Sequence, residues 1–250
     1  MDIYEKANLI NAKYIALCDK FHIPVQIHTI NDPDSPKHKT NVEDGVTVLL
    51  MNLARIPFAE YESHVGYFIG KILLPQLHME TERLILRRYL PEDADKCFSF
   101  LSNKQDAYMD CCKEFSIKNE DYYDRVAMFG QRETQYMIVL KYSNELIGTI
   151  NLFEDNSRAV DAMEIGYSIA HAFQRKGYAF EALSALLTLV QKELRLTMVT
   201  AGVLPENTAS QNLLMKLGFQ KEGLRHNAVW HEGLDKPVDL VYYYRDRQES

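Results

Sequence analysis

The sequence predicts an α+β fold in which a mostly antiparallel sheet carries helices inserted at set points along the chain. A strand-like run at 163–169 is followed by a short turn and an apolar helix at 180–190. Two further strand-like runs, 135–141 and 145–153, are joined by the polar residues Tyr142-Ser143-Asn144, which is a hairpin signal. Hairpins combined with inserted helices are typical of this fold class.

A domain boundary is predicted at Met79. The run 79–88 begins with this methionine and alternates apolar with basic residues, as a new strand would. We therefore expect an N-terminal segment over residues 1–78 and a second domain over 79–250. Pro91-Glu92-Asp93 places proline and acidic residues where the first turn of a helix tolerates them best, so a helix is expected to about Ser102.

Periodicity and turn residues predict the remaining elements. In the second domain they are a helix at 119–129, a strand at 159–169, a helix at 177–192, a strand at 197–203, a helix at 206–217 and terminal strands at 219–222 and 238–244. The first 78 residues predict a small α/β segment, with a helix at 4–21, a strand at 25–30 and then a polar loop.

The composition disfavours several classes of protein. Hydrophobic residues account for 46% of the 250 residues and charged residues for 25%, as in a soluble globular protein. No apolar run approaches the roughly 20 residues that cross a bilayer, and the N-terminus lacks a secretion signal, so we expect a cytoplasmic protein without a membrane partner. A net charge of −7 disfavours nucleic acid and suits cationic or amine partners. The four cysteines show no C-x-x-C spacing, so reduced thiols and no metal site are expected.

The run Gln174-Arg175-Lys176-Gly177-Tyr178-Ala179 is the most informative motif in the chain. It lies between a strand and a helix, where the first backbone N–H groups of the helix have no partner and carry about half a positive charge. Gly177 has no side chain at the point where a ligand would approach most closely. This arrangement predicts an anion site for a nucleotide-like cofactor, in preference to a purely structural turn.

Two further segments follow this motif. Asn207-Thr208-Ala209-Ser210 opens a helix that leads to Lys216-Leu217-Gly218-Phe219, and the later run Gly223-Leu224-Arg225-His226 precedes Trp230, Gly233 and a strand around 238–240. In this order, the three segments resemble the pyrophosphate loop, the N-x-x-S helix and the C-terminal part of the GNAT superfamily of N-acetyltransferases. The resemblance covers residues 79–250 and is strongest to the ribosomal-protein N-terminal (alanine) acetyltransferase branch.

The resemblance implies the GNAT fold, a mixed and mostly antiparallel twisted sheet with flanking helices, and acetyl-coenzyme A as co-substrate without a metal. It also implies that the strand before the loop parts from its neighbour, so that backbone groups of 167–169 and 201–203 line a split that holds the pantetheine arm. The residues that it assigns to coenzyme binding are Tyr167, Ser168, Ile169, Gln174, Arg175, Lys176, Gly177, Tyr178, Ala179, Asn207 and Ser210. Asn207 and Ser210 share a helix face, and we expect both to face the coenzyme, with helix capping as the alternative.

The catalytic residues are also assigned through the resemblance. Many GNAT members carry a tyrosine seven residues after the asparagine as the acid for the departing thiolate, and this position is Leu214. A serine at the Ser210 position is placed near the sulfur in the N-terminal acetyltransferase branch, which implies that Ser210 stabilises the thiolate by a hydrogen bond. An amine must also lose a proton, often to a carboxylate acting through water. Glu164 matches a glutamate of similar enzymes, with a cross-strand ion pair or an exposed edge position as the structural alternative.

The function implied is transfer of acetyl to a primary amine by direct attack in a ternary complex. The expected acceptor is the α-amino group of a protein or peptide. Polyamines, amino acids and aminoglycosides remain alternatives, because acceptor choice is expected to depend on the helices within 91–129 and on a loop at 224–237. Because Leu214 stands in place of the tyrosine, a non-catalytic module that senses coenzyme A also remains an alternative. For residues 1–78 a separate small domain, a lid over the acceptor site and an element of a homodimer remain open.

Overall fold

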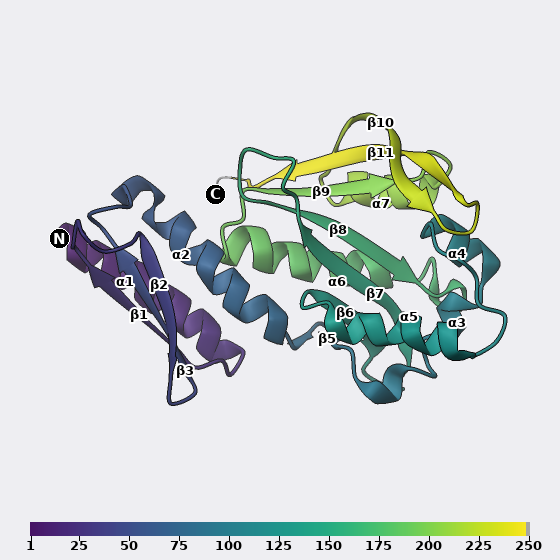
Figure 1. Ribbon diagram of the computed structural model, residues 1–250, viewed down its shortest axis with the longest axis horizontal. Helices are drawn as coiled ribbons and strands as arrows, with labels where there is room; N and C mark the ends of the chain where they lie inside the picture. The colour runs from purple at the N-terminus through teal and green to yellow at the C-terminus, as the bar shows by residue number, and fades with distance from the viewer. Residues whose placement is uncertain (249–250) are drawn as a thin grey trace. The chain divides into compact units, whose positions relative to one another are not determined.

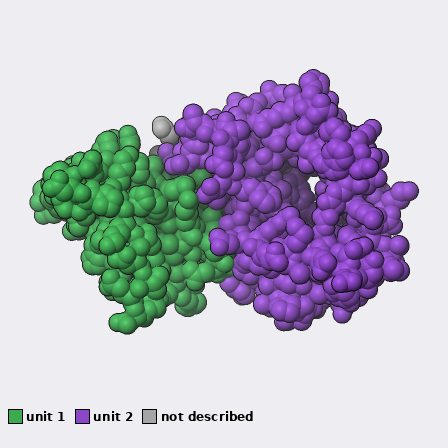
Figure 2. All heavy atoms as spheres, in the orientation of Figure 1, with its two compact units in different colours: residues 1–77, 189–196 green, residues 78–188, 197–250 purple. Residues whose placement is uncertain are grey.

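The computed structural model describes residues 1–248, and the chain divides into two compact units (Figure 2). Unit 1 comprises residues 1–77 and 189–196, and unit 2 comprises residues 78–188 and the chain from residue 197 onward. The segment 189–196 groups with unit 1 because it lies against Gly66, where an added Cβ would be 2.2 Å from the carbonyl oxygen of Leu194. A side chain at Gly66 would therefore force the segment away.

Unit 1 is an α/β unit with a three-stranded sheet. Its elements are α1 (Ile3–Lys20), β1 (Val25–Ile30), β2 (His38–Glu43), β3 (Val46–Asn52), α2 (Phe58–Leu73) and a 3₁₀ turn (Leu74–Gln76). The strand order is β1-β3-β2, with β1 parallel and β2 antiparallel to β3. The predicted helix at 4–21 and the strand at 25–30 are present, whereas the segment predicted as a polar loop contains β2.

A buried polar network ties the two helices of unit 1 to its sheet. The side chain of Asn11 on α1 donates to Thr29 Oγ1 on β1 at 2.9 Å and accepts from Tyr61 Oη on α2 at 3.0 Å. The Thr29 and Tyr61 hydroxyls lie 2.9 Å apart. Because each of these polar groups has a partner, their burial does not carry the penalty of an unpaired group.

Unit 2 contains the remaining elements (Figure 1). They are β4 (Met79–Glu80), β5 (Leu84–Arg88), α3 (Phe98–Leu101), α4 (Lys104–Met109), α5 (Glu120–Gln131), β6 (Gln135–Leu140), β7 (Leu146–Glu154), β8 (Ala162–Ile169), α6 (Tyr178–Leu187), β9 (Met198–Val203), α7 (Thr208–Lys216), β10 (Gln220–His231) and β11 (Lys236–Asp246). Short 3₁₀ turns lie at Pro91–Asp93 and His171–Phe173, and α6 runs into a π-helical turn at Thr188–Glu193, which belongs to unit 1 from Leu189 onward.

The strands of unit 2 form one mixed sheet in the order β10-β11-β9-β8-β7-β6-β5-β4. β8 and β9 are parallel and are connected through α6, while every other neighbouring pair is antiparallel. A mostly antiparallel sheet with helices inserted along the chain is the α+β architecture that the sequence predicts. The parallel pair needs the helical crossover because a short hairpin can join only antiparallel strands.

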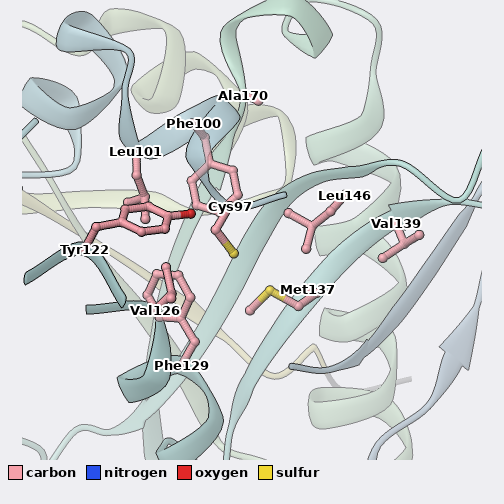
Figure 3. Packing of buried hydrophobic residues seen from close by; sticks show 10 residues of the cluster. All are labelled: Cys97, Phe100, Leu101, Tyr122, Val126, Phe129, Met137, Val139, Leu146 and Ala170. Carbon is pink, nitrogen blue, oxygen red and sulfur yellow. The ribbon is translucent and has the colours of Figure 1, made fainter. Parts of the chain in front are cut away.

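Helices α3 and α5 pack on β6 and β7 through a cluster of buried side chains (Figure 3). Tyr122 and Val126 of α5 lie against Phe100 of α3 and Met137 of β6 in this cluster. Their burial removes apolar surface from water and contributes roughly 1.5–3 kcal/mol for each large side chain. The packing fixes the start of α4, and with it one edge of the site described below.

Two sequence-based expectations for unit 2 are wrong in detail. The helix expected over 91–102 is broken into a 3₁₀ turn and α3, because the buried Asp93 carboxylate accepts two hydrogen bonds from Arg87 and one from the backbone N–H of Leu90. The segment expected as a loop at 224–237 is largely strand, since β10 continues to His231 against β11. Cross-strand pairing therefore overrides the local signals there.

Candidate active site

The sheet of unit 2 opens between β8 and β9. These strands pair only over 162–164 and 198–200, and within residues 1–248 no later pair joins them. β8 stays paired with β7 as far as Ile169, and β9 stays paired with β11 as far as Val203. The facing backbone edges beyond the last pair lack each other's hydrogen bonds, and such groups need a ligand or water as partner.

A cavity of about 490 Å³, the first cavity, borders this gap. Ten of the eleven residues predicted to bind the coenzyme line it: Tyr167, Ser168, Ile169, Gln174, Arg175, Gly177, Tyr178, Ala179, Asn207 and Ser210. Lys176 does not line it, and its ammonium lies 5.1 Å from the centre of the Phe173 ring. Segments 40 residues apart in the sequence therefore meet around one space.

The loop before α6 has a backbone suited to an anion. Arg175 and Gly177 adopt left-handed conformations, with φ of +62° and +83°. The first backbone hydrogen bond of α6 runs from the N–H of Glu181 to the carbonyl oxygen of Gly177 at 3.0 Å, so the N–H groups of 178–180 have no acceptor inside the helix. Free amides at the positive end of a helix dipole bind phosphate groups. A left-handed arginine costs about 1–2 kcal/mol, and such strain is typical of functional loops.

Asp106 of α4 holds this loop in place. Its carboxylate accepts the backbone N–H of His171 at 2.8 Å and the Nε2 group of Gln174 at 2.9 Å. Gln174 Nε2 also donates to the carbonyl oxygen of Ile169 at 2.9 Å. The side-chain amide of Gln174 is therefore engaged within the protein, where it positions the loop.

A second set of contacts ties the loop to the chain before β5. Arg83 Nη1 donates to the carbonyl oxygen of Lys176 at 3.1 Å, and Arg83 Nε donates to Glu181 at 2.6 Å. The Thr81 hydroxyl donates to the same carboxylate at 2.5 Å. Burial by itself would raise the pKa of Glu181, but the hydrogen bonds from Thr81 and Arg83 outweigh it and hold the pKa below its ordinary value. Glu181 therefore stays ionised and supports the loop.

Asn207 and Ser210 lie at the start of α7. Asn207 Oδ1 accepts the backbone N–H of Ser210 at 3.1 Å, so Asn207 is the N-cap of the helix. The capping role, given above as the alternative for Asn207, is thus present, and Asn207 lines the first cavity as well. The cap fixes the beginning of α7 and with it the position of Ser210.

Tyr167 of β8 contacts Ser210 across the two elements. The Tyr167 and Ser210 hydroxyls lie 2.6 Å apart and are hydrogen-bonded. Burial raises the pKa of Tyr167 to about 12, so its phenol is protonated at neutral pH and can donate. Leu214, where many family members have tyrosine, is fully buried in the core. A phenol beside Ser210 is therefore supplied from β8 and not from α7.

A second cavity of about 410 Å³ adjoins the first. The residues that line both cavities, called the junction below, are Met109, Asp110, Tyr167, Ser168, Asn207 and Ser210. Beyond the junction, strands β6 to β9 and the helix α5 contribute most of the second cavity's walls. The hydrogen-bonded pair Tyr167–Ser210 thus stands where the two spaces meet.

Glu164 lines the second cavity and not the first. Its nearest polar partner is the hydroxyl of Tyr242, at 3.5 Å, and within residues 1–248 no ion pair holds it. Burial and the charge of Asp155 raise the pKa of Glu164, while Arg225 opposes the shift. The predicted base is therefore a carboxylate of increased basicity on the wall of the second cavity.

Asp106 and Asp110 belong to the site although the sequence did not indicate them. Asp110 ends α4 and belongs to the junction, where the Ser168 hydroxyl donates to its carboxylate. Solvent in the cleft reaches Asp110, yet protein surrounds it, and this desolvation together with the charge of Asp106 raises its pKa to about 7. Neither residue belongs to a recognisable motif, and they lie more than 60 residues before the loop that they contact.

Two other kinds of feature are absent from the described residues. Within residues 1–248 no group of three or more His, Cys, Asp or Glu side chains is arranged to hold a metal ion. In the same range no helix has both the length and the apolar character to cross a membrane.

Residues 83–220 match the family model described as an acetyltransferase (GNAT) domain. The chain belongs to the GNAT acetyltransferase family. It is accordingly an N-acetyltransferase, as the resemblance of residues 79–250 implied. GNAT acetyltransferases use acetyl-coenzyme A, and the free amides of 178–180 beside the first cavity fit the pyrophosphate of this co-substrate.

Similar proteins share both the sequence and the fold of this GNAT enzyme. The N-acetyltransferase YoaA of Bacillus subtilis is 31% identical over 177 residues, which cover 66% of the chain and 94% of YoaA. The [ribosomal protein uS5]-alanine N-acetyltransferase of Escherichia coli is 25% identical over 180 residues, covering 64% of the chain and 87% of that protein. The crystal structure of a GNAT-family acetyltransferase from Bacillus anthracis superposes with a TM-score of 0.59 at 26% identity, covering 69% of the chain and all of that structure.

Proposed function

We propose that this GNAT enzyme moves acetyl from acetyl-coenzyme A to the α-amino group of a protein or peptide by direct attack in a ternary complex. The observation that carries the proposal is the pair of cavities that meet at Tyr167 and Ser210. Direct transfer needs both substrates bound at once with their reacting atoms adjacent. Two cavities with a common junction provide such an arrangement.

The first cavity is proposed to hold the coenzyme. The backbone amides of 174–179 bind the pyrophosphate, with Arg175 and Lys176 adding positive charge, and the open edge of β8 at 167–169 binds the pantetheine arm. When bound, acetyl-coenzyme A supplies an acetyl group activated as a thioester. Asn207 and Ser210 border this cavity on the opposite side, from α7.

Ser210 is proposed to stabilise the departing sulfur. Either hydroxyl of the Tyr167–Ser210 pair can donate, and with Tyr167 donating to Ser210 Oγ the serine hydrogen is free to donate in turn. Such a relay of two hydroxyls replaces the missing tyrosine at Leu214, because hydrogen bonds in a chain polarise one another. Glu164 is proposed as the carboxylate that takes up the proton of the amine through water in the second cavity.

The second cavity also contains groups that suit a peptide acceptor. Gln135 and Asn151 are cross-strand partners on β6 and β7, and both line this cavity. Gln135 Nε2 is a buried donor and Asn151 Oδ1 a buried acceptor, and neither has a hydrogen-bond partner within residues 1–248. A peptide bond offers one acceptor and one donor, so it matches this pair. The uS5-alanine acetyltransferase relative, by its name, also acts on a protein.

Acetylation of a matched peptide panel tests the proposal. The enzyme is given acetyl-coenzyme A with peptides that have a free N-terminus, the same peptides with a blocked N-terminus and an internal lysine, and small amines of the polyamine, amino-acid and aminoglycoside classes. Thiol release is followed, and mass spectrometry locates the acetyl group. We expect transfer to the free α-amine only. Transfer restricted to small amines, or to the lysine of blocked peptides, would contradict the proposal.

A further inference from the structure

Asp110 is a carboxylate at the junction that the proposed function does not use. It terminates α4, and its backbone N–H donates to the carbonyl oxygen of Asp106 at 3.0 Å. It lines both cavities, as Tyr167 and Ser210 do, whereas Glu164 lines only the second. A group that must contact both the amine and the acetyl carbon has to lie at this junction.

The polar surroundings of Asp110 are few. The Ser168 hydroxyl of β8 donates to its carboxylate, Asp106 lies nearby on α4, and the Tyr167 phenol, Cys111 and Cys112 each have a pKa raised in part by the Asp110 charge. Burial is the larger cause of the shift in each of these three groups. No arginine or lysine forms an ion pair with Asp110 within residues 1–248. The positive partner that its anionic form lacks would be supplied by an ammonium group.

The other charged side chains of the two cavities already have ion-pair, hydrogen-bond or ring partners, or they lie outside the junction. Arg125 of the second cavity pairs with Glu232, and Arg132 donates to the side chain of Gln135 at 3.4 Å. In the first cavity Glu206 accepts from the Tyr108 hydroxyl at 2.6 Å, and Lys216 lies over the Phe180 ring. Asp110 is therefore the carboxylate of the junction that is open to a cationic acceptor.

We propose that Asp110 is a catalytic residue that binds the incoming ammonium group and takes one of its protons. The nitrogen then forms a bond to the acetyl carbon, the carbon–sulfur bond breaks and the sulfur leaves with its electron pair. The sulfur receives the second proton of the amine, and Asp110 passes its own proton through water of the second cavity to Glu164, which releases it to solvent. This inference rests on the proposed direct transfer and names the group that receives the proton at the junction.

The basicity of Asp110 matches that of an α-amine. Desolvation raises the pKa of Asp110 to about 7, and a free α-amino group titrates at about 7.7–8.0, so transfer between them is unfavourable by only about tenfold. A lysine side chain titrates at about 10.4, and the same transfer is unfavourable by more than about 1000-fold. The gap between the two acceptors follows from their own pKa values and holds for any base at the junction, so an α-amine gives up its proton to Asp110 more readily than a lysine side chain does.

Replacement of Asp110 by asparagine tests this inference, since Asp110→Asn keeps the size of the side chain and an acceptor for Ser168. We expect kcat/KM for a free-N-terminus peptide to fall by about 100-fold, the lower end of the range for a proton-transfer group. The plot of kcat/KM against pH should lose its ascending limb near pH 7. The affinity for coenzyme A should stay within twofold of the wild-type value. The matched control is Asp235→Asn at the exposed β10–β11 turn, where a left-handed residue at φ +51° tolerates asparagine.

Thermal unfolding of the same variant separates catalysis from folding. Because the folded-state pKa of Asp110 is raised, the folded state holds an extra proton between about pH 4 and 7, and its stability falls as the pH rises through this window. Asparagine does not ionise, so Asp110→Asn removes this pH-dependent loss of stability. We therefore expect its Tm at pH 8 to equal or exceed that of the wild type. A variant that is inactive and has a lower Tm at pH 8 would point to a structural role and overturn the inference.

Two further outcomes distinguish the inference from the proposed function. Suppose that Asp110→Asn keeps both the wild-type kcat/KM and the ascending limb of its pH profile near 7, while Glu164→Gln loses this limb. Glu164 then takes the proton of the amine directly, and the inference about Asp110 is wrong. If the wild type acetylates only small amines, the peptide acceptor is wrong. The inference then stands if Asp110→Asn lowers the rate with those amines and is overturned if it does not.

Discussion

The two cavities of this enzyme are built in different ways. The first is lined by the loop before α6 and by parts of α4, β8 and α7, and backbone amides at the start of α6 are its proposed ligands. The second is made of side chains from strands β6 to β9, from α5 and from the chain after α4. Backbone amides recognise what every coenzyme A molecule shares, whereas scattered side chains can change from enzyme to enzyme. The comparison indicates that coenzyme binding is fixed by local conformation and acceptor choice by tertiary packing.

The largest effect is expected from a change in the backbone of the first cavity. Gly177→Val places a β-branched residue at φ +83°, where left-handed conformation costs an ordinary residue about 1–2 kcal/mol and valine more. We expect coenzyme A affinity, measured by calorimetry, to fall by about 100-fold, equivalent to about 2.7 kcal/mol.

A matched control for this change is Gly45→Val. Gly45 has a similar φ of +80° in the turn between β2 and β3 of unit 1, with open space around it. The control should lose stability without losing coenzyme affinity. Equal loss of affinity in both variants would show that general destabilisation, and not the loop, is responsible.

The next effect is expected in the second cavity. Glu164→Gln removes the carboxylate proposed to receive the amine proton through water, and we expect kcat/KM for the amine to fall by about 30-fold, somewhat less than the about 10²–10⁴-fold of a group that takes the proton directly. Coenzyme A affinity should stay near that of the wild type. Steady-state kinetics with Glu145→Gln, an exposed residue before β7, provide the control. Full activity of Glu164→Gln would remove this residue from the mechanism.

A smaller effect is expected from the unpaired amides. Gln135→Met removes the unpaired Nε2 donor together with the Oε1 atom that accepts from Arg132 at 3.4 Å, so we expect a loss of about 1 kcal/mol in stability. We expect kcat/KM for peptides to fall by about tenfold, the loss of one hydrogen bond of about 1.4 kcal/mol. The rate with an amine that carries no amide group should not change.

The control for this variant is Gln131→Met at the exposed end of α5, which makes the same chemical change outside both cavities. If Gln135 and Asn151 pair only with each other, Gln135→Met would leave the ratio of peptide to small-amine rates unchanged. That result would remove the support for a peptide acceptor that rests on these two residues.

The smallest effect is expected from a residue that acts through the loop. Asp106→Ala removes the acceptor for the backbone of His171 and for the side chain of Gln174. A hydrogen bond of about 1 kcal/mol corresponds to about a fivefold change, and we expect this loss in coenzyme A affinity by titration calorimetry. If kcat for the amine changes and the coenzyme affinity does not, Asp106 acts on the acceptor in the second cavity and not on the coenzyme in the first.

The sequence predicted the part of the molecule where local conformation decides. The strand, the turn with Gly177 and the helix α6 are close to their expected positions, and ten of the eleven residues assigned to coenzyme binding surround one cavity. Turn residues and helix starts act over a few neighbours, so they can be recognised in a linear pattern. The α+β class followed from the same short-range signals.

Residues whose roles depend on contacts distant in sequence were not predicted. Asp106 and Asp110 reach the site only because α4 packs against the loop after β8, and Gln135 reaches it because β6 pairs with β7. The proposed replacement of the missing tyrosine at Leu214 by Tyr167 is of the same kind, since it needs β8 and α7 to lie together. Long-range pairing also extended β10 through the segment that was expected to be a loop.

The sequence by itself determined the family, the class of fold and the position of the turn proposed to bind an anion, because each depends on residues a few positions apart. Only the tertiary structure decided which carboxylates and hydroxyls stand at the junction of the two cavities. Asp110, Tyr167 and Ser210 come from three separate elements. Their proximity depends on how these elements pack, and the protein that packing places around them raises the pKa of the solvent-accessible Asp110 and of the half-buried Tyr167 by desolvation.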